Sequence, residues 1–215
     1  STDKIELSPD TVLALYSTLF FQAKWDDEFD EKNNTDGIFH GINGDTSVTY
    51  MNKKLCQMYY YWHDDFSAVG LSLKNGSTMW FILPDEGKTT ADILNEGSYG
   101  ELISSGNTED GWQNKKYMKV NLSVPNFDIS STLNLKDGLN RMGVTKVFDI
   151  KSSDFTAITS DTPVYVTAVN QSARVEIDEN GVKAAAYIEF PGAGAAQPPE
   201  EIIDFVLDRP FVFAP

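Results

Sequence analysis

"DENGVKAAAYIEFPGAGAAQPPEE", residues 178–201, lies just before the last apolar stretch of the chain. Residues 182–190 contain no proline, so every position keeps the backbone donor that a strand needs inside a sheet. Alternate positions are apolar and could face a core: Val182, Ala184, Ala186 and Ile188. The positions between them could face solvent: Lys183, Ala185, Tyr187 and Glu189. This is the pattern of a strand without a sheet, whereas a disordered linker would need no such alternation.

The composition sets limits on the fold and on the partners. With 215 residues, 41% of them hydrophobic, the chain can bury a sizeable core. We expect a single domain over 1–215, because no linker-like stretch occurs before residue 178. The 17 basic and 32 acidic residues give a net charge of −15. This charge argues against nucleic acid, membrane and heparin as partners.

The residue types that carry catalysis or bind metals are scarce. Cys56 is the only cysteine, which excludes an internal disulfide, and we expect it to be structural. Asp64 and Asp65 follow His63, but sequence neighbours rarely form a catalytic triad, so we expect neither His40 nor His63 to be catalytic or a ligand. No phosphate-binding glycine loop or cysteine-pair zinc motif occurs. The sequence therefore predicts a protein that is not an enzyme and needs no cofactor.

Strand signals outnumber helix signals along the rest of the chain. Strands are expected at 11–21, in hairpins turning at Asn43-Gly44 (with shorter strands) and Asn75-Gly76, at 117–127, at 163–178 and on both sides of Pro210. Short helices are expected within 88–103, with Thr89 or Thr90 as N-cap, and within 132–144, ended by Gly143. The apolar parity of 163–178 changes near Asn170 and Gln171, which predicts a bulge or a switch of faces there. The class is α+β with mixed sheets.

Three stretches together resemble one family. They are "FFQAKWDDEFD" at 20–30, "MWFILPDEGK" at 79–88, and "VEIDENGVKAAA" at 175–186 followed by "RPFVF" at 209–213. In this order and approximate spacing they resemble the serpins, a family of serine protease inhibitors. The resemblance covers essentially the whole chain and implies the serpin fold.

The resemblance implies that 178–201 contains the hinge and the reactive-centre loop, which a protease attacks. It assigns the hinge to Glu179, Gly181, Val182, Ala184, Ala185 and Ala186. Counting from Gly181 by the family's usual interval places the scissile bond between Ala195 and Ala196. Val182 stands where inhibitors commonly have Thr or Ser, but it is uncharged and compatible with insertion into a sheet.

The resemblance also implies a region where the central sheet opens. The resemblance places Trp25 at the point where insertion begins, although Trp25 is equally consistent with an ordinary core residue. Ser17 and Gln171 stand where the family has Asn and His between the parting strands. Asn126 replaces the basic residue that often pairs with the hinge Glu, leaving Glu179 a hydrogen bond at best.

The implied activity is inhibition of a serine protease. The protease attacks Ala195, forms an acyl-enzyme and is trapped when the cut loop inserts between strands 11–21 and 164–177. A small residue before the scissile bond suits an elastase-like or subtilisin-like enzyme. Two alternatives stay open: a non-inhibitory serpin that acts as a carrier or storage protein, and a β-rich surface-binding module whose loop is a linker.

The resemblance implies that more polypeptide is needed for a whole serpin. The N-terminal helices and the last strand of the family have no counterpart in these 215 residues. We therefore expect a C-terminal portion that requires the remainder of the serpin polypeptide, and poor solubility or self-association if it is purified alone. By resemblance the protein would be extracellular or at the cell surface, with no signal peptide in this chain.

Overall fold

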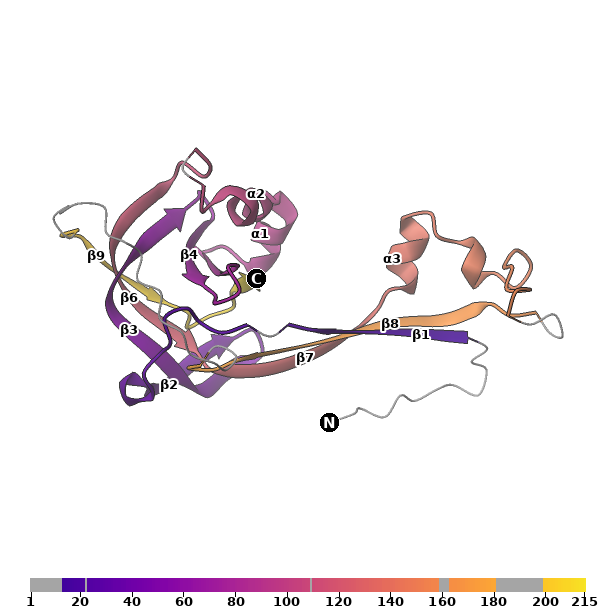
Figure 1. The fold of residues 1–215 in the computed structure, drawn as a ribbon, viewed down its shortest axis with the longest axis horizontal. Coiled ribbons are helices and arrows are strands. Elements are labelled where there is room, and N and C mark those ends of the chain that lie inside the picture. The colour runs from indigo at the N-terminus through magenta and orange to yellow at the C-terminus, as the bar shows by residue number, and fades with distance from the viewer. Residues whose placement is uncertain (1–12, 22, 109, 159–162, 181–198) are drawn as a thin grey trace. The chain divides into compact units, whose positions relative to one another are not determined.

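A computed structural model describes residues 13–21, 23–108, 110–158, 163–180 and 199–215. The chain divides into two compact units, which are treated separately below (Figure 1). Unit 1 comprises 1–21 and 128–175, and unit 2 comprises 22–127 and 176–215. Across the described ranges, no helix has both the length and the apolar character needed to cross a membrane.

Unit 1 is built on a three-stranded sheet with the order β1-β8-β7. Its strands are β1 (Leu13–Phe20), β8 (Val166–Ile177) and β7 (Phe127–Asn134). β1 and β8 are parallel and directly paired, with Ala14 opposite Ala168 and Phe20 opposite Arg174. The β7–β8 contacts, such as Asp128 with Arg174 and the Leu135 N–H with the Val169 carbonyl, fit an antiparallel pair. α3 (Lys136–Arg141) and the 3-10 helix η2 (Lys146–Phe148) follow β7.

The strand from 163 to 178 contains an irregularity, but not where the parity change predicts it. The register shift lies between Leu13 and Ala14 on β1, opposite Val166 and Ala168, so Thr167 is the extra residue. From Ala14 to Phe20 the pairing runs without interruption past Asn170 and Gln171. The predicted position was wrong because β8 is half-buried on both faces there, so side-chain type does not report the face.

Unit 2 is built on a seven-stranded sheet. Six strands follow the order β10-β5-β4-β3-β6-β9, and β2 pairs with β3 outside this path. The strands are β2 (Thr35–Gly41), β3 (Gly44–Trp62), β4 (Phe66–Ser72), β5 (Thr78–Pro84), β6 (Lys115–Pro125), β9 (Ile202–Val206) and β10 (Val212–Ala214). β6 shows the predicted alternation, with Met118, Val120, Leu122 and Val124 buried.

β3 is much longer than the short strand predicted after Asn43-Gly44. It runs for 19 residues, of which 44–50 pair with β2, 50–61 with β6 and 60–62 with β4. A bulge between Lys53 and Cys56 divides it, and Leu55 there adopts a φ of 53°. The Leu55 N–H donates to Asn121 Oδ1 at 3.0 Å. The bulge re-aims the strand without ending it, and for this reason local signals do not reveal its length.

The core of unit 2 lies around the β4–β5 hairpin. Residues from Met79 to Pro84 of β5 are all buried, so both faces of this strand are covered. A cluster of buried side chains joins the sheet to two helices: Tyr61, Phe66, Ala68, Trp80, Ile82, Ile93, Leu102 and Trp112. The helices are α1 (Thr90–Glu96) and α2 (Ser98–Ser105), seen beside β4 in Figure 1. As predicted, Thr89 is an N-cap, and it forms a capping box with Asp92.

Candidate functional site

The chain is held at several points immediately before the predicted loop. The Trp25 indole Nε1–H donates to the Asp178 carbonyl at 2.8 Å. The Phe29 N–H donates to the Glu179 carbonyl at 3.0 Å. The Asn34 amide Nδ2 donates to Glu179 Oε1 at 2.5 Å. We call Trp25, Phe29, Asn34, Asp178 and Glu179 the hinge anchor, because these contacts hold the backbone just before the predicted loop.

Trp25 is the rigid part of the hinge anchor. It is only 2% exposed, and its ring contacts Phe29 edge-on at 5.8 Å and Phe81 at 6.2 Å between centroids. Its backbone forms an isolated β-bridge with Leu73. A tryptophan fixed in this way can present its single N–H donor in one direction only. The structure shows Trp25 as a core residue that contacts Asp178, and its role in insertion stays a prediction.

Asn34 is the polar part of the hinge anchor. It caps the C-terminus of the 3-10 helix η1 (Glu31–Asn33), with its backbone N–H donating to the Glu31 carbonyl at 3.1 Å. This contact holds the backbone of Asn34, while its side chain contacts Glu179. Asn126, the predicted counterpart of Glu179, is instead exposed and donates its backbone N–H to the Thr49 carbonyl at 2.8 Å. The side-chain partner of Glu179 in the structure is therefore Asn34.

Ser17 and Gln171 lie directly opposite one another in the β1–β8 pair of unit 1. Ser17 is exposed and Gln171 is half-buried. The structure thus brings these two predicted residues together, in a different unit from Trp25 and Asn126. The parallel pairing is continuous here, so no third strand separates β1 from β8 in this structure.

The remaining predicted residues lie outside the described ranges. They are the hinge residues Gly181, Val182, Ala184, Ala185 and Ala186, and the predicted scissile pair Ala195 and Ala196. Their assignment stays a prediction. The described chain resumes at Pro199 and enters β9, which pairs in parallel with β6.

Cys56 has the surroundings of an unreactive thiol. Burial raises its pKa, and although nearby Lys53 acts in the opposite direction, Asp27 raises it further. A thiol with a raised pKa is a poor nucleophile at neutral pH, because the thiolate is the reactive form. This agrees with the structural role expected for Cys56.

Sequence reasoning missed Phe29 and Asn34. Both belong to a charged stretch, "DDEFDEKNN" at 26–34, which is typical of a solvated turn. Asn34 and Glu179 are 145 positions apart, and no local pattern encodes contacts at that distance. The usable signal was Asp30, whose side chain accepts from the Lys32 N–H and starts the helix that Asn34 ends.

Comparisons with known proteins agree with the fold. A family model described as Serpin (serine protease inhibitor) matches residues 2–214. Alpha-1-antiproteinase 2 of Equus caballus is 31% identical over 96% of this chain and 47% of its own length. Alpha-1-antiproteinase F of Cavia porcellus is 32% identical over 97% of this chain and 49% of its own. The chain thus spans about half the length of the curated relatives it matches.

Solved structures give the same result for the fold. The native state of the thermophilic serpin tengpin superposes with a TM-score of 0.75 at 22% identity, covering 97% of this chain and 53% of tengpin. A serpin from the trematode Schistosoma haematobium gives a TM-score of 0.74 at 25% identity, with 96% and 53% covered. The sequence match, the mixed sheets and the short helices all lead to one conclusion: this chain belongs to the serpin family.

Proposed function

We propose that the protein containing this chain inhibits a serine protease by trapping it as an acyl-enzyme. One observation carries the proposal. β8, paired in parallel with β1, leads through the hinge anchor into a proline-free segment with strand alternation. The antiproteinases that match this chain support inhibition in general, while the mechanism and the target are our inference.

The geometry of the β1–β8 pair suits insertion. A segment that leaves the C-terminal end of β8 and turns back would run antiparallel to β8, and therefore antiparallel to β1. The register from Leu13–Val166 to Phe20–Arg174 would be replaced by two antiparallel ladders. Insertion would therefore replace one ladder of backbone hydrogen bonds by two. Both new ladders would be antiparallel, and antiparallel pairs are slightly more stable per residue than parallel ones. The uninserted state is then held by a kinetic barrier.

The target follows from the predicted scissile bond. A protease that cleaves after Ala195 needs a primary pocket that accepts a methyl group. A trypsin-like pocket would be left with an unpaired buried carboxylate, which strongly disfavours alanine. We therefore infer an elastase-like or subtilisin-like target, met outside the cell or at its surface.

The test uses the full-length protein and pancreatic elastase on a denaturing gel. A covalent band at the summed mass is the expected result, since the acyl-enzyme survives denaturation. An Ala195→Arg variant should lose this band with elastase and gain it with trypsin. Cleavage at another peptide bond would refute the assignment of Ala195.

Two matched hinge variants test insertion. Ala184→Arg puts a charge on the core-facing parity and should reduce the covalent band at least tenfold while cleavage continues. Ala185→Arg puts the same charge on the solvent-facing parity and should retain the band. Equal loss in both variants would contradict the proposed alternation.

The alternative, a non-inhibitory serpin acting as a carrier or storage protein, gives a different result. Cleavage would leave elastase fully active with no covalent band, and a melting curve of the cut protein would then be needed. A gain of many degrees would indicate a loop that inserts without trapping. An unchanged melting temperature would favour a loop that acts only as a linker.

A further inference from the structure

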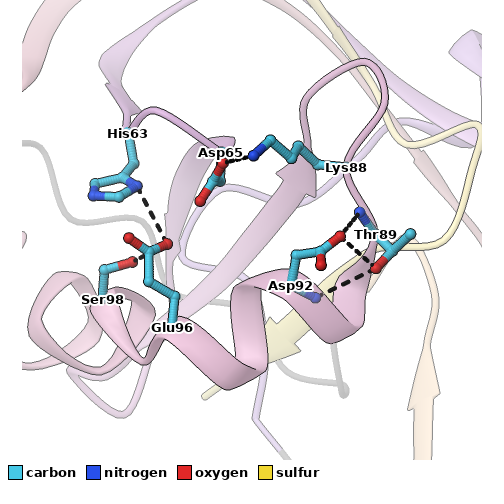
Figure 2. Close-up of polar contacts among 7 residues, drawn as sticks. All are labelled: His63, Asp65, Lys88, Thr89, Asp92, Glu96 and Ser98. Carbon is cyan, nitrogen blue, oxygen red and sulfur yellow. Dashed lines mark hydrogen bonds and ion pairs between the residues drawn. The ribbon is translucent and has the colours of Figure 1, made fainter.

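Against the expectation from sequence that His63 is not a ligand, we propose that His63, Asp65 and Glu96 form a binding site for a divalent transition-metal ion, with Zn²⁺ as the preferred ion. His63 and Asp65 belong to the tight turn between β3 and β4, and Glu96 is the last residue of α1. Within the described part of the chain, the metal-ligating atoms of these three side chains lie within 4.8 Å of one another (Figure 2). The site is in unit 2, away from the hinge anchor, and does not depend on the proposed function.

The orientation of His63 is the strongest indication. Its ring stacks on Phe66 at 5.2 Å with an interplanar angle of 20°, and contacts Trp112 at 5.8 Å. This packing leaves the ring little freedom to turn. Its Nδ1 is buried and has no hydrogen-bond partner among the described residues, while Glu96 Oε2 lies 3.7 Å away. A buried nitrogen without a partner is costly, and a metal ion between these two atoms would remove that cost.

The two carboxylates give the site its negative charge. Asp65 forms an ion pair with Lys88 through Oδ1, and Figure 2 shows this carboxylate between Lys88 and the His63–Glu96 pair. With a neutral imidazole, Asp65, Glu96 and Lys88 together carry a charge of −1, so a cation is favoured. Lys88 would not contact the metal but would orient the Asp65 carboxylate, as hydrogen-bonding groups around metal sites do.

The surroundings hold Glu96 near this position. The Ser98 hydroxyl donates to Glu96 Oε2 at 3.4 Å. The capping box of Thr89 and Asp92 fixes the beginning of α1, and Gly97 in the left-handed conformation fixes its end. The Glu96 side chain is still 40% exposed, which leaves it the small movement needed to reach metal–ligand distances of about 2.0–2.2 Å.

The ligand types select the ion. One imidazole nitrogen and two carboxylate oxygens, with a water completing a tetrahedron, suit Zn²⁺. Ca²⁺ and Mg²⁺ prefer sites made of oxygen alone. A bound ion would connect the β3–β4 turn to the end of α1 and so stabilise the folded unit.

The test is a titration of the metal-stripped full-length protein with ZnCl₂ by calorimetry, together with its melting temperature. We expect one equivalent to bind, and the melting temperature of the full-length protein to rise by about 3 °C at a hundredfold excess over Kd. Co²⁺ in place of Zn²⁺ should give visible absorption typical of four- or five-coordinate nitrogen and oxygen ligation. No binding at 100-fold molar excess of ZnCl₂, roughly millimolar, would overturn the proposal.

Variants locate the site. Glu96→Gln and His63→Phe should each weaken binding at least tenfold, and His63→Phe keeps an aromatic ring against Phe66. His40→Gln is the matched control, because His40 has a single carboxylate partner, Asp45 at 2.9 Å, and both are exposed. Glu96 is near the surface, so its variant should fold even where His63→Phe does not. Zn²⁺ binding that survives Glu96→Gln, or that is lost in His40→Gln, would refute the assignment.

Discussion

β5 and β8 are both interior strands, but they are held in different ways. In β5 all residues from Met79 to Pro84 are buried, and the strand lies in the core of unit 2. In β8 only the end residues Val166 and Ile177 are buried, and the strand is held mainly by its backbone ladders to β1 and β7. Side-chain burial makes a strand costly to separate from its sheet, whereas a ladder can be exchanged for another ladder. We therefore expect β5 to stay paired with its neighbours, and β8 to be the strand whose pairing can change.

The largest test of this comparison removes a buried side chain that packs on β5, the ring of Trp25 against Phe81. Trp25→Ala deletes a ring that is 2% exposed and should lower the free energy of unfolding by about 3–5 kcal/mol. Trp62→Ala is the matched control, because Trp62 is 39% exposed, and it should cost about 1 kcal/mol or less. Urea unfolding of both variants measures the difference. Equal losses would show that burial does not separate the two positions.

A second test uses alkaline pH. Burial, and to a smaller extent Tyr59, raises the pKa of Tyr61 to about 12, while an unfolded tyrosine ionises near 10. The unfolded state therefore loses its proton first. This contribution to stability is complete below pH 10 and lost as the pH rises to about 12, a fall of about 2–3 kcal/mol.

Tyr61→Phe should reduce this slope in the pH dependence of unfolding without abolishing it, because burial also raises the pKa of Tyr50 and of Tyr60. Tyr16→Phe in β1, at a site that is 42% exposed, is the control and should keep the slope of the parent protein. Urea midpoints measured between pH 9 and pH 12 compare the two. A slope in Tyr61→Phe as steep as that of the parent protein would disprove the contribution of Tyr61.

A smaller effect is expected at the hinge anchor. Asn34→Ala leaves the half-buried Glu179 carboxylate without its amide donor and should cost about 1–2 kcal/mol. Asn33→Ala changes the exposed neighbouring side chain and should be close to neutral. Urea unfolding gives the cost, and limited proteolysis between 181 and 198 shows whether the loop becomes more accessible. Equal proteolysis in both variants would remove Asn34 from the anchor.

The smallest expected effect concerns the β7–β8 pair. Arg174 donates two hydrogen bonds to Asp128, at 2.8 and 2.6 Å, which lowers the pKa of Asp128. A carboxyl with a lowered pKa stabilises the fold above its unfolded value of about 3.9, and this stability is lost as the pH falls through the folded value.

Asp128→Asn should therefore lower the melting temperature at pH 7 by at most ~3 °C, since both side chains are about half exposed. The difference from the parent should vanish near pH 2. Melting curves at both pH values test this expectation. A difference that persists at pH 2 would require a cause other than the charge of Asp128.

The sequence predicted the elements that depend on local chemistry. Asn75-Gly76 specifies a hairpin turn, and Thr89 with Asp92 specifies a helix start, because the groups that bond are only a few positions apart. The buried alternation of β6 follows from its period of two. Three short stretches of sequence likewise predicted the family.

The features that the sequence did not predict depend on contacts between distant residues. Asn34 contacts Glu179 only after η1 and β8 are in place, and Glu96 reaches His63 only when α1 packs on the sheet. The bulge at Thr167 was misplaced because it depends on the register against β1, a property of two strands rather than one. Such features are set by tertiary structure, which no single window of sequence contains.

The identity of the side chain facing Glu179 has a consequence for the medium in which the protein works. Asn34 is an uncharged amide, so the attraction does not join two full opposite charges. Dissolved ions screen exposed ion pairs over a Debye length of about 8–10 Å at moderate salt, but they affect a short hydrogen bond to an amide far less. The restraint on the hinge should therefore keep nearly the same strength in dilute and in saline surroundings.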